Sequence, residues 1–92
     1  MGSLFSWDDA KAASNFQKHR VGFPEASTVF GDALSRTIPD TGHSFGERRY
    51  ITIGVSEMGR QLVVVHTDRD ETIRIISARR PTKAERKFYE NR

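Results

Sequence analysis

The alternation of apolar and polar positions predicts three consecutive β-strands in the second half of the chain. From residue 48 to 55, Ile51, Ile53 and Val55 alternate with polar or small residues. A second strand is predicted over residues 61–67, around a run of three valines, and a third over residues 72–78. Turn-forming residues separate these strands at 58–59 and 68–71. Because tight turns join adjacent strands, we predict that they pair antiparallel.

The first half has a helical pattern after a short apolar strand at residues 4–7. Asp8 is a candidate N-cap, and the helix that follows places Ala10, Ala13 and Phe16 on one face before Gly22 ends it. A shorter helix is predicted with Pro24 in its first turn, and it ends at residues 31–32. A weak strand at 34–38 and a flexible loop at 39–46 lead into the three strands.

Pro81 breaks the last strand, and a C-terminal helix begins directly after it. Thr82 and Glu85 have the spacing of a capping box. The order of elements predicts an α+β fold, an antiparallel sheet with the N-terminal helices packed on one face and a C-terminal helix. The other sheet face is then expected to be partly open to solvent. At 92 residues the chain is expected to form a single domain, residues 1–92.

Composition narrows the classes of protein. The absence of cysteine excludes a disulfide framework and any thiolate nucleophile or ligand. No apolar run approaches the ~20 residues that a membrane-spanning helix needs, and the N-terminal residues lack the pattern of a secretory signal. We therefore expect a cytoplasmic protein with no membrane contact.

Positive charge is concentrated at the C-terminal end. From Thr72 onward there are seven Lys or Arg residues and two acidic residues, a net charge of +5, whereas the whole chain has +3. Guanidinium groups on a strand and helix are suited to binding a polyanion, and phosphates in particular.

The chain resembles a known family in four segments that follow one another in the expected order. These are WDDAKAASNFQKHRVGFPEASTVF, GERRYITIG, LVVVHT and IRIISARRPTKAERKFYE. They resemble the BrnT toxins of bacterial type II toxin–antitoxin operons. A departure from the family pattern is Arg20, where relatives often have glycine.

The resemblance implies a RelE-like fold and a ribonuclease toxin that inhibits translation by cutting RNA. It also implies a BrnA-like antitoxin that binds the toxin directly. Contact with operon DNA is then expected only through the antitoxin, whose dimer represses the shared operon.

The residues present favour RNA cleavage without a metal. The carboxylates are scattered along the sequence, and the three histidines at positions 19, 43 and 66 lack paired ligand spacing, so we expect no metal site and no cofactor. Attack by a 2′-hydroxyl needs a base, cations that stabilise the charged phosphorus centre, and an acid for the leaving oxygen. The candidate catalytic residues are Arg79, Tyr89, Arg48, Glu47 and His19. The candidate RNA-binding residues are Arg74, Arg80, Lys83, Arg86 and Lys18.

Several of these residues also have structural interpretations, which stay open at this stage. Arg74 could reach across the sheet to Glu47, and His19 could serve the dipole at the end of its helix. Glu85 and Arg86 could pair with helix neighbours. Arg79 is the strongest candidate, because an arginine that closes a buried strand has no evident structural role. A non-catalytic basic module that binds nucleic acid or an acidic protein is the alternative function.

Overall fold

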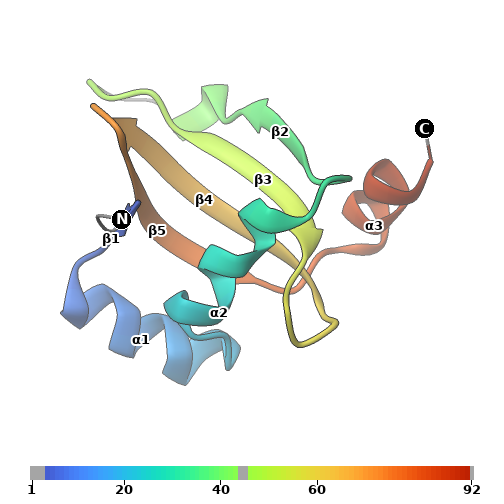
Figure 1. The fold of residues 1–92 in the computed structure, drawn as a ribbon, viewed down its shortest axis with the longest axis horizontal. Coiled ribbons are helices and arrows are strands. Elements are labelled where there is room, and N and C mark those ends of the chain that lie inside the picture. Colours follow the sequence, from blue (N-terminus) through green and yellow to red (C-terminus); the bar gives the residue numbers. More distant parts are fainter. Residues whose placement is uncertain (1–3, 44–45, 92) are drawn as a thin grey trace.

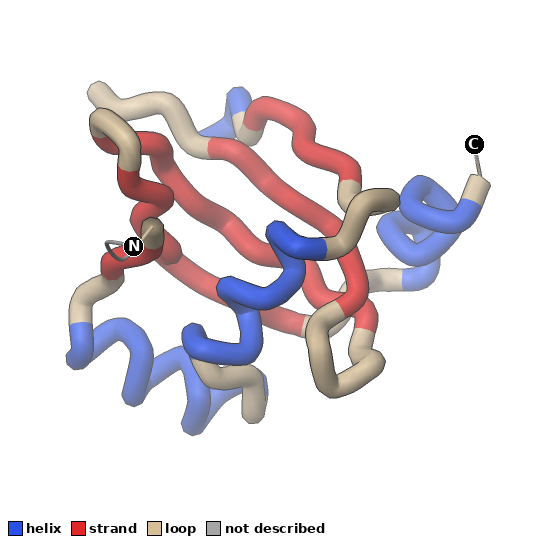
Figure 2. Tube along the Cα trace, viewed as in Figure 1, coloured by secondary structure: helices blue, strands red, loops and turns tan. Residues whose placement is uncertain are grey.

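The computed structural model describes residues 4–43 and 46–91. Within these residues three α-helices and two short 3-10 turns pack around a five-stranded sheet of order β1-β5-β4-β3-β2 (Figures 1 and 2). The elements are β1 (Phe5–Ser6), α1 (Asp9–His19), α2 (Phe23–Thr28), η1 (Val29–Gly31), β2 (Arg36–Pro39), η2 (Thr41–His43), β3 (Tyr50–Val55), β4 (Gln61–Arg69), β5 (Thr72–Arg79) and α3 (Lys83–Glu90).

The predicted α+β class is confirmed, but the prediction of a purely antiparallel sheet is wrong. Strands β2 to β5 pair antiparallel, whereas β1 pairs parallel with β5 through Phe5 opposite Ile73 and Ser6 opposite Arg74. Short hairpins fix the direction of β3, β4 and β5. No turn joins β1 to β5, so its direction is set by packing and not by a hairpin. The sheet is therefore mixed.

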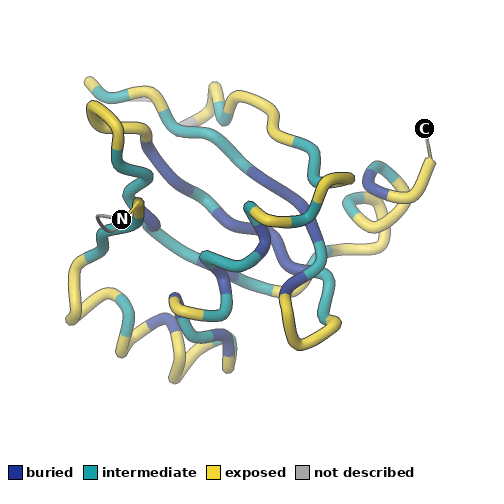
Figure 3. Tube along the Cα trace, in the orientation of Figure 1, coloured by how far each residue is buried: buried dark blue, intermediate teal, exposed yellow. Residues whose placement is uncertain are grey.

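The larger core lies on the sheet face covered by α1, α2 and η1, which we call the first face. Its fully or nearly fully buried side chains come from Val21 after α1, from α2 and η1, and from β4 and β5. Trp7 packs edge-on against Phe23, with ring centroids 5.9 Å apart, as expected for core residues. The buried members are Val21, Phe23, Ala26, Val29, Leu62, Val64, Ile75 and Ala78 (Figure 3).

The opposite face, which we call the second face, is covered at one end by α3. Tyr89 forms a smaller core cluster there with Ile53 and Val63, and Phe88 packs against it. Away from α3, Val65 and Ser77, which pair across β4 and β5 on this face, are only partly buried, so the second face is partly open there.

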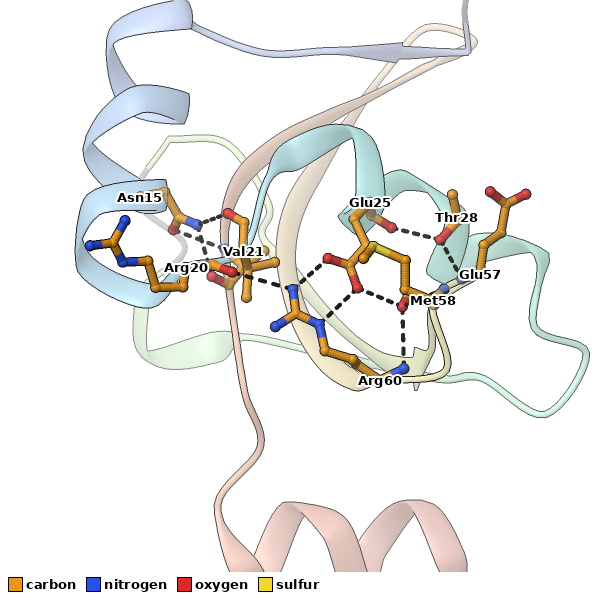
Figure 4. Close-up of polar contacts among 10 residues, drawn as sticks. Asn15, Arg20, Val21, Glu25, Thr28, Glu57, Met58 and Arg60 are labelled. Carbon is orange, nitrogen blue, oxygen red and sulfur yellow. Dashed lines mark hydrogen bonds and ion pairs between the residues drawn. The ribbon is translucent and has the colours of Figure 1, made fainter.

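Helix α1 closes the edge of β5 through one buried side chain. The amide of Asn15 donates to the carbonyl of Ala78 at 2.9 Å and accepts the N–H of Ala78 at 3.1 Å. The same NH₂ group donates to the carbonyl of Val21 at 3.0 Å (Figure 4). Asn15 thus supplies the two hydrogen bonds that a neighbouring strand would make, and the edge of β5 is not left unpaired.

Several predicted boundaries shift. Helix α1 ends at His19, three residues before Gly22, and Arg20 takes the left-handed cap position with φ of 58°. The weak strand begins at Arg36, the predicted loop contains the turn η2, and its residues 44–45 lie outside the described part. Asp8 caps α1 by accepting the N–H of Lys11, and the capping box of α3 is present, both as predicted.

Candidate functional site

Two predicted site residues meet in a small pocket between α1 and β5. This α1–β5 pocket has a volume of about 200 Å³. His19 and Lys18 come from the last turn of α1, where Lys11 lies two turns earlier on the same side. Its lining is Lys11, Ser14, Asn15, Lys18, His19, Ile76 and Ser77. The hydrogen bonds between Asn15 and Ala78 hold α1 beside β5. The imidazole of His19 and the ammonium groups of Lys11 and Lys18 therefore surround one concave surface.

Arg74 lies near this pocket on β5. Ile75 enters the first core, and Arg74, the preceding residue of the strand, points to the second face. A bulge follows, in which Ile76 is the extra residue between the pairs Ile75–His66 and Ser77–Val65. The charge of Arg74 lowers the pKa of Asp8, the N-cap of α1, which is held down chiefly by the N–H of Lys11. Positive charge from β5 therefore reaches the start of α1.

Glu47 has a different partner from the predicted one. Its carboxylate accepts from Arg69, with distances of 2.6 Å to Nε and 2.9 Å to Nη2. This bond is the main reason that the pKa of Glu47 is lowered, and the charges of Arg74 and Arg49 lower it further. Of the two interpretations of Arg74, the structural one is found only in part, because Arg74 acts on Glu47 through its charge while the hydrogen bonds come from Arg69.

Arg79 has a structural role that the sequence did not suggest. Its Nη1 and Nη2 donate to the two carboxylate oxygens of Glu85, each at 2.8 Å. Glu85 also completes the predicted capping box with Thr82, and its ion-pair partner is Arg79 on β5 and not a neighbour on the helix. The Arg79 guanidinium lowers the pKa of Glu85 to about 2. The Arg79 side chain remains 34% exposed, which leaves part of the guanidinium open to an anion.

Tyr89 is buried, with 9% of its surface exposed. Its hydroxyl donates to Asp32 Oδ2 at 2.5 Å, and the same carboxylate oxygen accepts the N–H of Val55 at 2.9 Å. The other oxygen accepts the N–H of Leu34. Asp32 therefore joins α3, β3 and the turn after η1. In the sequence, Asp32 was identified only as part of the end of a helix. Its hydrogen bond places Tyr89 in a structural network away from the α1–β5 pocket.

The remaining predicted cations do not converge on one site. Arg48 is exposed and lines a separate hollow with Pro39 and Thr41 at the end of β2. Arg80 is exposed, and its charge lowers the pKa of Glu25 on the first face. Lys83 and Arg86 are exposed on α3. Basic residues that are close in the sequence thus face different sides of the molecule.

His66 is a buried polar residue that the sequence suggested only as an unpaired metal-ligand candidate. It is 3% exposed, and its Nε2 lies 2.8 Å from the hydroxyl of Thr52, which is itself 2.7 Å from the hydroxyl of Thr37. Nδ1 lies 3.3 Å from Asp68 Oδ1. Burial lowers the pKa of His66, and Asp68 partly opposes that effect. The signal for this position was a histidine directly after the run of three valines in a strand that was predicted to be buried.

Two features bear on metals and membranes. Within residues 4–43 and 46–91, no three His, Asp or Glu side chains gather in a way that could hold a metal ion. None of the described helices is long and apolar enough to span a bilayer.

Comparison with known proteins identifies the family. Residues 7–85 match the family model described as the ribonuclease toxin BrnT of type II toxin–antitoxin systems. The chain belongs to the BrnT family. The structure is similar to the 1.1 Å crystal structure of the Brucella abortus ribonuclease toxin BrnT, with a TM-score of 0.68 and 18% identity over 89% of this chain and 100% of that one. No curated protein sequence matches the chain.

BrnT membership explains the predicted motifs as one set, and an identity of 18% establishes a shared fold and nothing finer. The family consists of ribonuclease toxins, and a type II system implies an antitoxin partner.

Proposed function

We propose that this BrnT-family chain is a metal-independent endoribonuclease that inhibits translation by cutting RNA and is neutralised by a BrnA-like antitoxin. The observation that carries the proposal is the α1–β5 pocket, where His19 lies among Lys11, Lys18 and the β5 side chains. An imidazole can accept or donate a proton near neutral pH, and cations beside it favour a phosphate. The cytoplasm is the compartment that this activity requires.

Each group has a role in the proposed reaction. His19 takes the proton from the attacking 2′-hydroxyl or gives one to the leaving 5′-oxygen. Lys18 and Arg74 hold the phosphate and stabilise the charge that develops on it. Arg79, fixed by Glu85, extends the cationic path toward α3, where Lys83 and Arg86 contact flanking phosphates.

The other candidates contribute less directly. Glu47 keeps Arg69 in place, and Tyr89 keeps α3 against the sheet through Asp32. Arg48 and Arg80 lie away from the pocket and are suited to longer segments of RNA or to the partner.

The carboxylates support a mechanism without metal. Glu25, Glu47 and Glu85 each accept hydrogen bonds from an arginine guanidinium. Mg²⁺ binding at these three carboxylates would compete with the guanidinium groups for the same oxygens. We therefore expect cleavage of total RNA to continue in EDTA. Cleavage that stops in EDTA and returns with Mg²⁺ would contradict this part of the proposal.

Paired variants test the pocket. His19→Gln should lower the cleavage rate about 100-fold or more while the melting temperature stays within a few degrees, because a proton-transfer group is lost and packing is kept. Arg74→Ala should weaken RNA binding and cleavage together. Lys87→Ala, an exposed charge on α3, is the matched control and should be near parent activity. If His19→Gln and Arg74→Ala both cleave normally, the pocket is not the site. RNA binding by the parent without any cleavage would favour the basic-module alternative.

The antitoxin is proposed to cover part of the cationic surface and to abolish cleavage. Arg80 is the clearer test position, because Arg79 is needed by Glu85. Arg80→Glu should weaken the complex with a BrnA-like protein and reduce its sensitivity to salt. An unchanged affinity and salt dependence would place the contact elsewhere.

A further inference from the structure

A second concave surface lies on the first face, between the end of α1, α2 and the β3–β4 turn. We call it the α1–α2 groove, and it has a volume of about 680 Å³. It is hollowed on the opposite side of the sheet from Arg74, so it is separate from the α1–β5 pocket. Figure 4 shows its polar floor and rim. The residues used in the argument are Phe16, Arg20, Pro24, Glu25, Met58 and Arg60.

The groove is already formed, because hydrogen bonds tie its three walls together. Arg60 donates to Glu25 through Nε at 3.0 Å and also through Nη2, and it reaches the carbonyl of Arg20 at 3.3 Å. Glu25 also accepts from the hydroxyl of Ser56 at 2.7 Å. The pKa of Glu25 is lowered chiefly by Arg60, so this floor stays ionised and fixed. A surface fixed in advance loses little entropy when a partner binds.

Large apolar side chains line the rim and face solvent. Phe16 is 47% exposed and Met58 is 72% exposed, and Pro24 between them is also exposed. An aromatic ring and a flexible thioether together on one groove are typical of protein-binding surfaces. Neither side chain belongs to the buried core clusters, so folding does not account for their position.

Charges beside the groove indicate what kind of segment fits. The Arg20 guanidinium lies over the Phe16 ring at 5.6 Å from its centroid, and the charge of Arg80 reaches Glu25 from the other end. Glu25 and Arg60 neutralise each other inside. Glu57 is the other acidic residue of the lining, and the cations Arg20 and Arg80 act on the apolar rim side and on Glu25. These two cations complement acidic side chains that flank an apolar segment. RNA, in contrast, is disfavoured here, because the carboxylates of Glu25 and Glu57 line the groove and repel phosphates.

We infer that the α1–α2 groove is the anchor site for the antitoxin, and that it receives a segment whose apolar side chains are flanked by acidic ones. This inference rests on the proposed function for the identity of the partner. Arg79 and Arg80 are consecutive in the sequence, but Arg79 lies opposite Val63 on the second face while Arg80 acts on Glu25 of the first. A segment anchored in the groove can thus continue past Arg80 toward the cationic path around Arg79.

The test compares single charge insertions at exposed apolar positions. Phe16→Glu and Met58→Glu introduce repulsion toward acidic side chains without removing a buried group. Leu34→Glu is the matched control, because Leu34 is 56% exposed and lies outside the groove lining. Binding of each purified variant to a purified BrnA-like antitoxin is measured by calorimetry, and RNA cleavage, melting temperature and sedimentation are measured on the free protein.

We expect Phe16→Glu and Met58→Glu to weaken the complex about 10-fold or more, as loss of an interface hot spot does, with RNA cleavage and melting unchanged. Leu34→Glu should bind within about twofold of the parent. The inference is overturned if the groove variants bind like the parent, if Leu34→Glu weakens binding equally, or if the parent forms no complex. It is also overturned if the groove variants lose RNA cleavage while folded, or abolish self-association of the free chain. Groove-dependent binding by a parent that does not cleave RNA would instead contradict the proposed function alone.

Discussion

Replacing Asn15 tests how α1 is held against the sheet. Its side chain is 7% exposed and makes three hydrogen bonds, two with Ala78 and one with the carbonyl of Val21. Asn15→Leu keeps a side chain of similar size but removes every donor and acceptor. The N–H and carbonyl of Ala78 would then lie at the edge of β5 without these partners, and the carbonyl of Val21 would lose its donor.

The expected loss follows from these bonds. A hydrogen bond inside a protein contributes about 0.5–1.5 kcal/mol net, so three correspond to roughly 1.5–4.5 kcal/mol, and we expect about 3 kcal/mol for Asn15→Leu. For a domain of this size, about 1 kcal/mol lowers the melting temperature by roughly 4–8 °C, so the variant should melt about 12–24 °C below the parent.

Urea unfolding followed by circular dichroism measures this loss directly. Gln17→Leu is the matched control, because Gln17 is exposed on the same helix and its replacement should change stability by no more than about 0.5 kcal/mol. Asn15→Asp adds a second check. A carboxylate would face two carbonyl oxygens, so its pKa should rise and its deficit relative to the parent should shrink as the pH is lowered and the carboxyl is protonated. If Asn15→Leu unfolds within about 1 kcal/mol of the parent, Asn15 does not hold the strand edge.

Three further predictions follow from other positions. Arg20→Gly should stabilise the protein by a few tenths to about 1 kcal/mol in urea unfolding, because glycine adopts a φ of 58° without the strain that a side chain causes. A lower stability of the variant would mean that the contact of Arg20 with the Phe16 ring outweighs this strain. Glu85 has a folded pKa of about 2 against an ordinary 4.5, so the stability that it contributes is complete above pH 4.5 and is lost as the pH falls through 2. Because both partners are in contact with solvent, we expect this contribution to be about 1–2 kcal/mol and to be absent in Glu85→Gln. An equal acid dependence of stability in that variant would contradict the role of Arg79. Burial lowers the pKa of His66, so the unfolded chain binds a proton there more readily, and the free energy of unfolding should fall as the pH drops below about 6.5. His66→Gln should reduce this dependence of stability on pH between pH 7 and 5. An unchanged dependence would mean that other groups cause it.

The local pattern of the sequence determined much of the fold. Alternation and tight turns located β3, β4 and β5, and cap chemistry at Asp8 and Thr82 located the starts of α1 and α3. These features depend on residues a few positions apart. The parallel direction of β1 depends on packing across most of the chain, and no short-range signal encodes it.

The candidate site was predicted less well, for a related reason. Charge counting treated the arginines of the C-terminal segment as one basic surface. The bond from Arg79 to Glu85 depends on how β5 turns into α3, and that of Arg69 to Glu47 depends on strand neighbours far apart in the sequence. The sequence did not indicate the role of Asn15. A buried asparagine on an amphipathic helix looks the same in the sequence as one that faces solvent, until its hydrogen-bond partners are known.

The proposals place the two tasks of a toxin of this class, RNA cleavage and antitoxin binding, at two separate concave surfaces. Arg60 and Arg79 both form ion pairs that join separate segments, so their first role is to fix the fold. His19 and Lys18 line a concavity on the α1 side of β5, where a phosphate would meet a proton carrier. The exposed apolar side chains gather on the other face, above the fixed pair of Glu25 and Arg60. A partner anchored there need not imitate RNA to be specific, because it contacts apolar side chains beside carboxylates that repel the phosphates of RNA. To block the cationic path around Arg79 as well, the partner would need to extend past the end of β5.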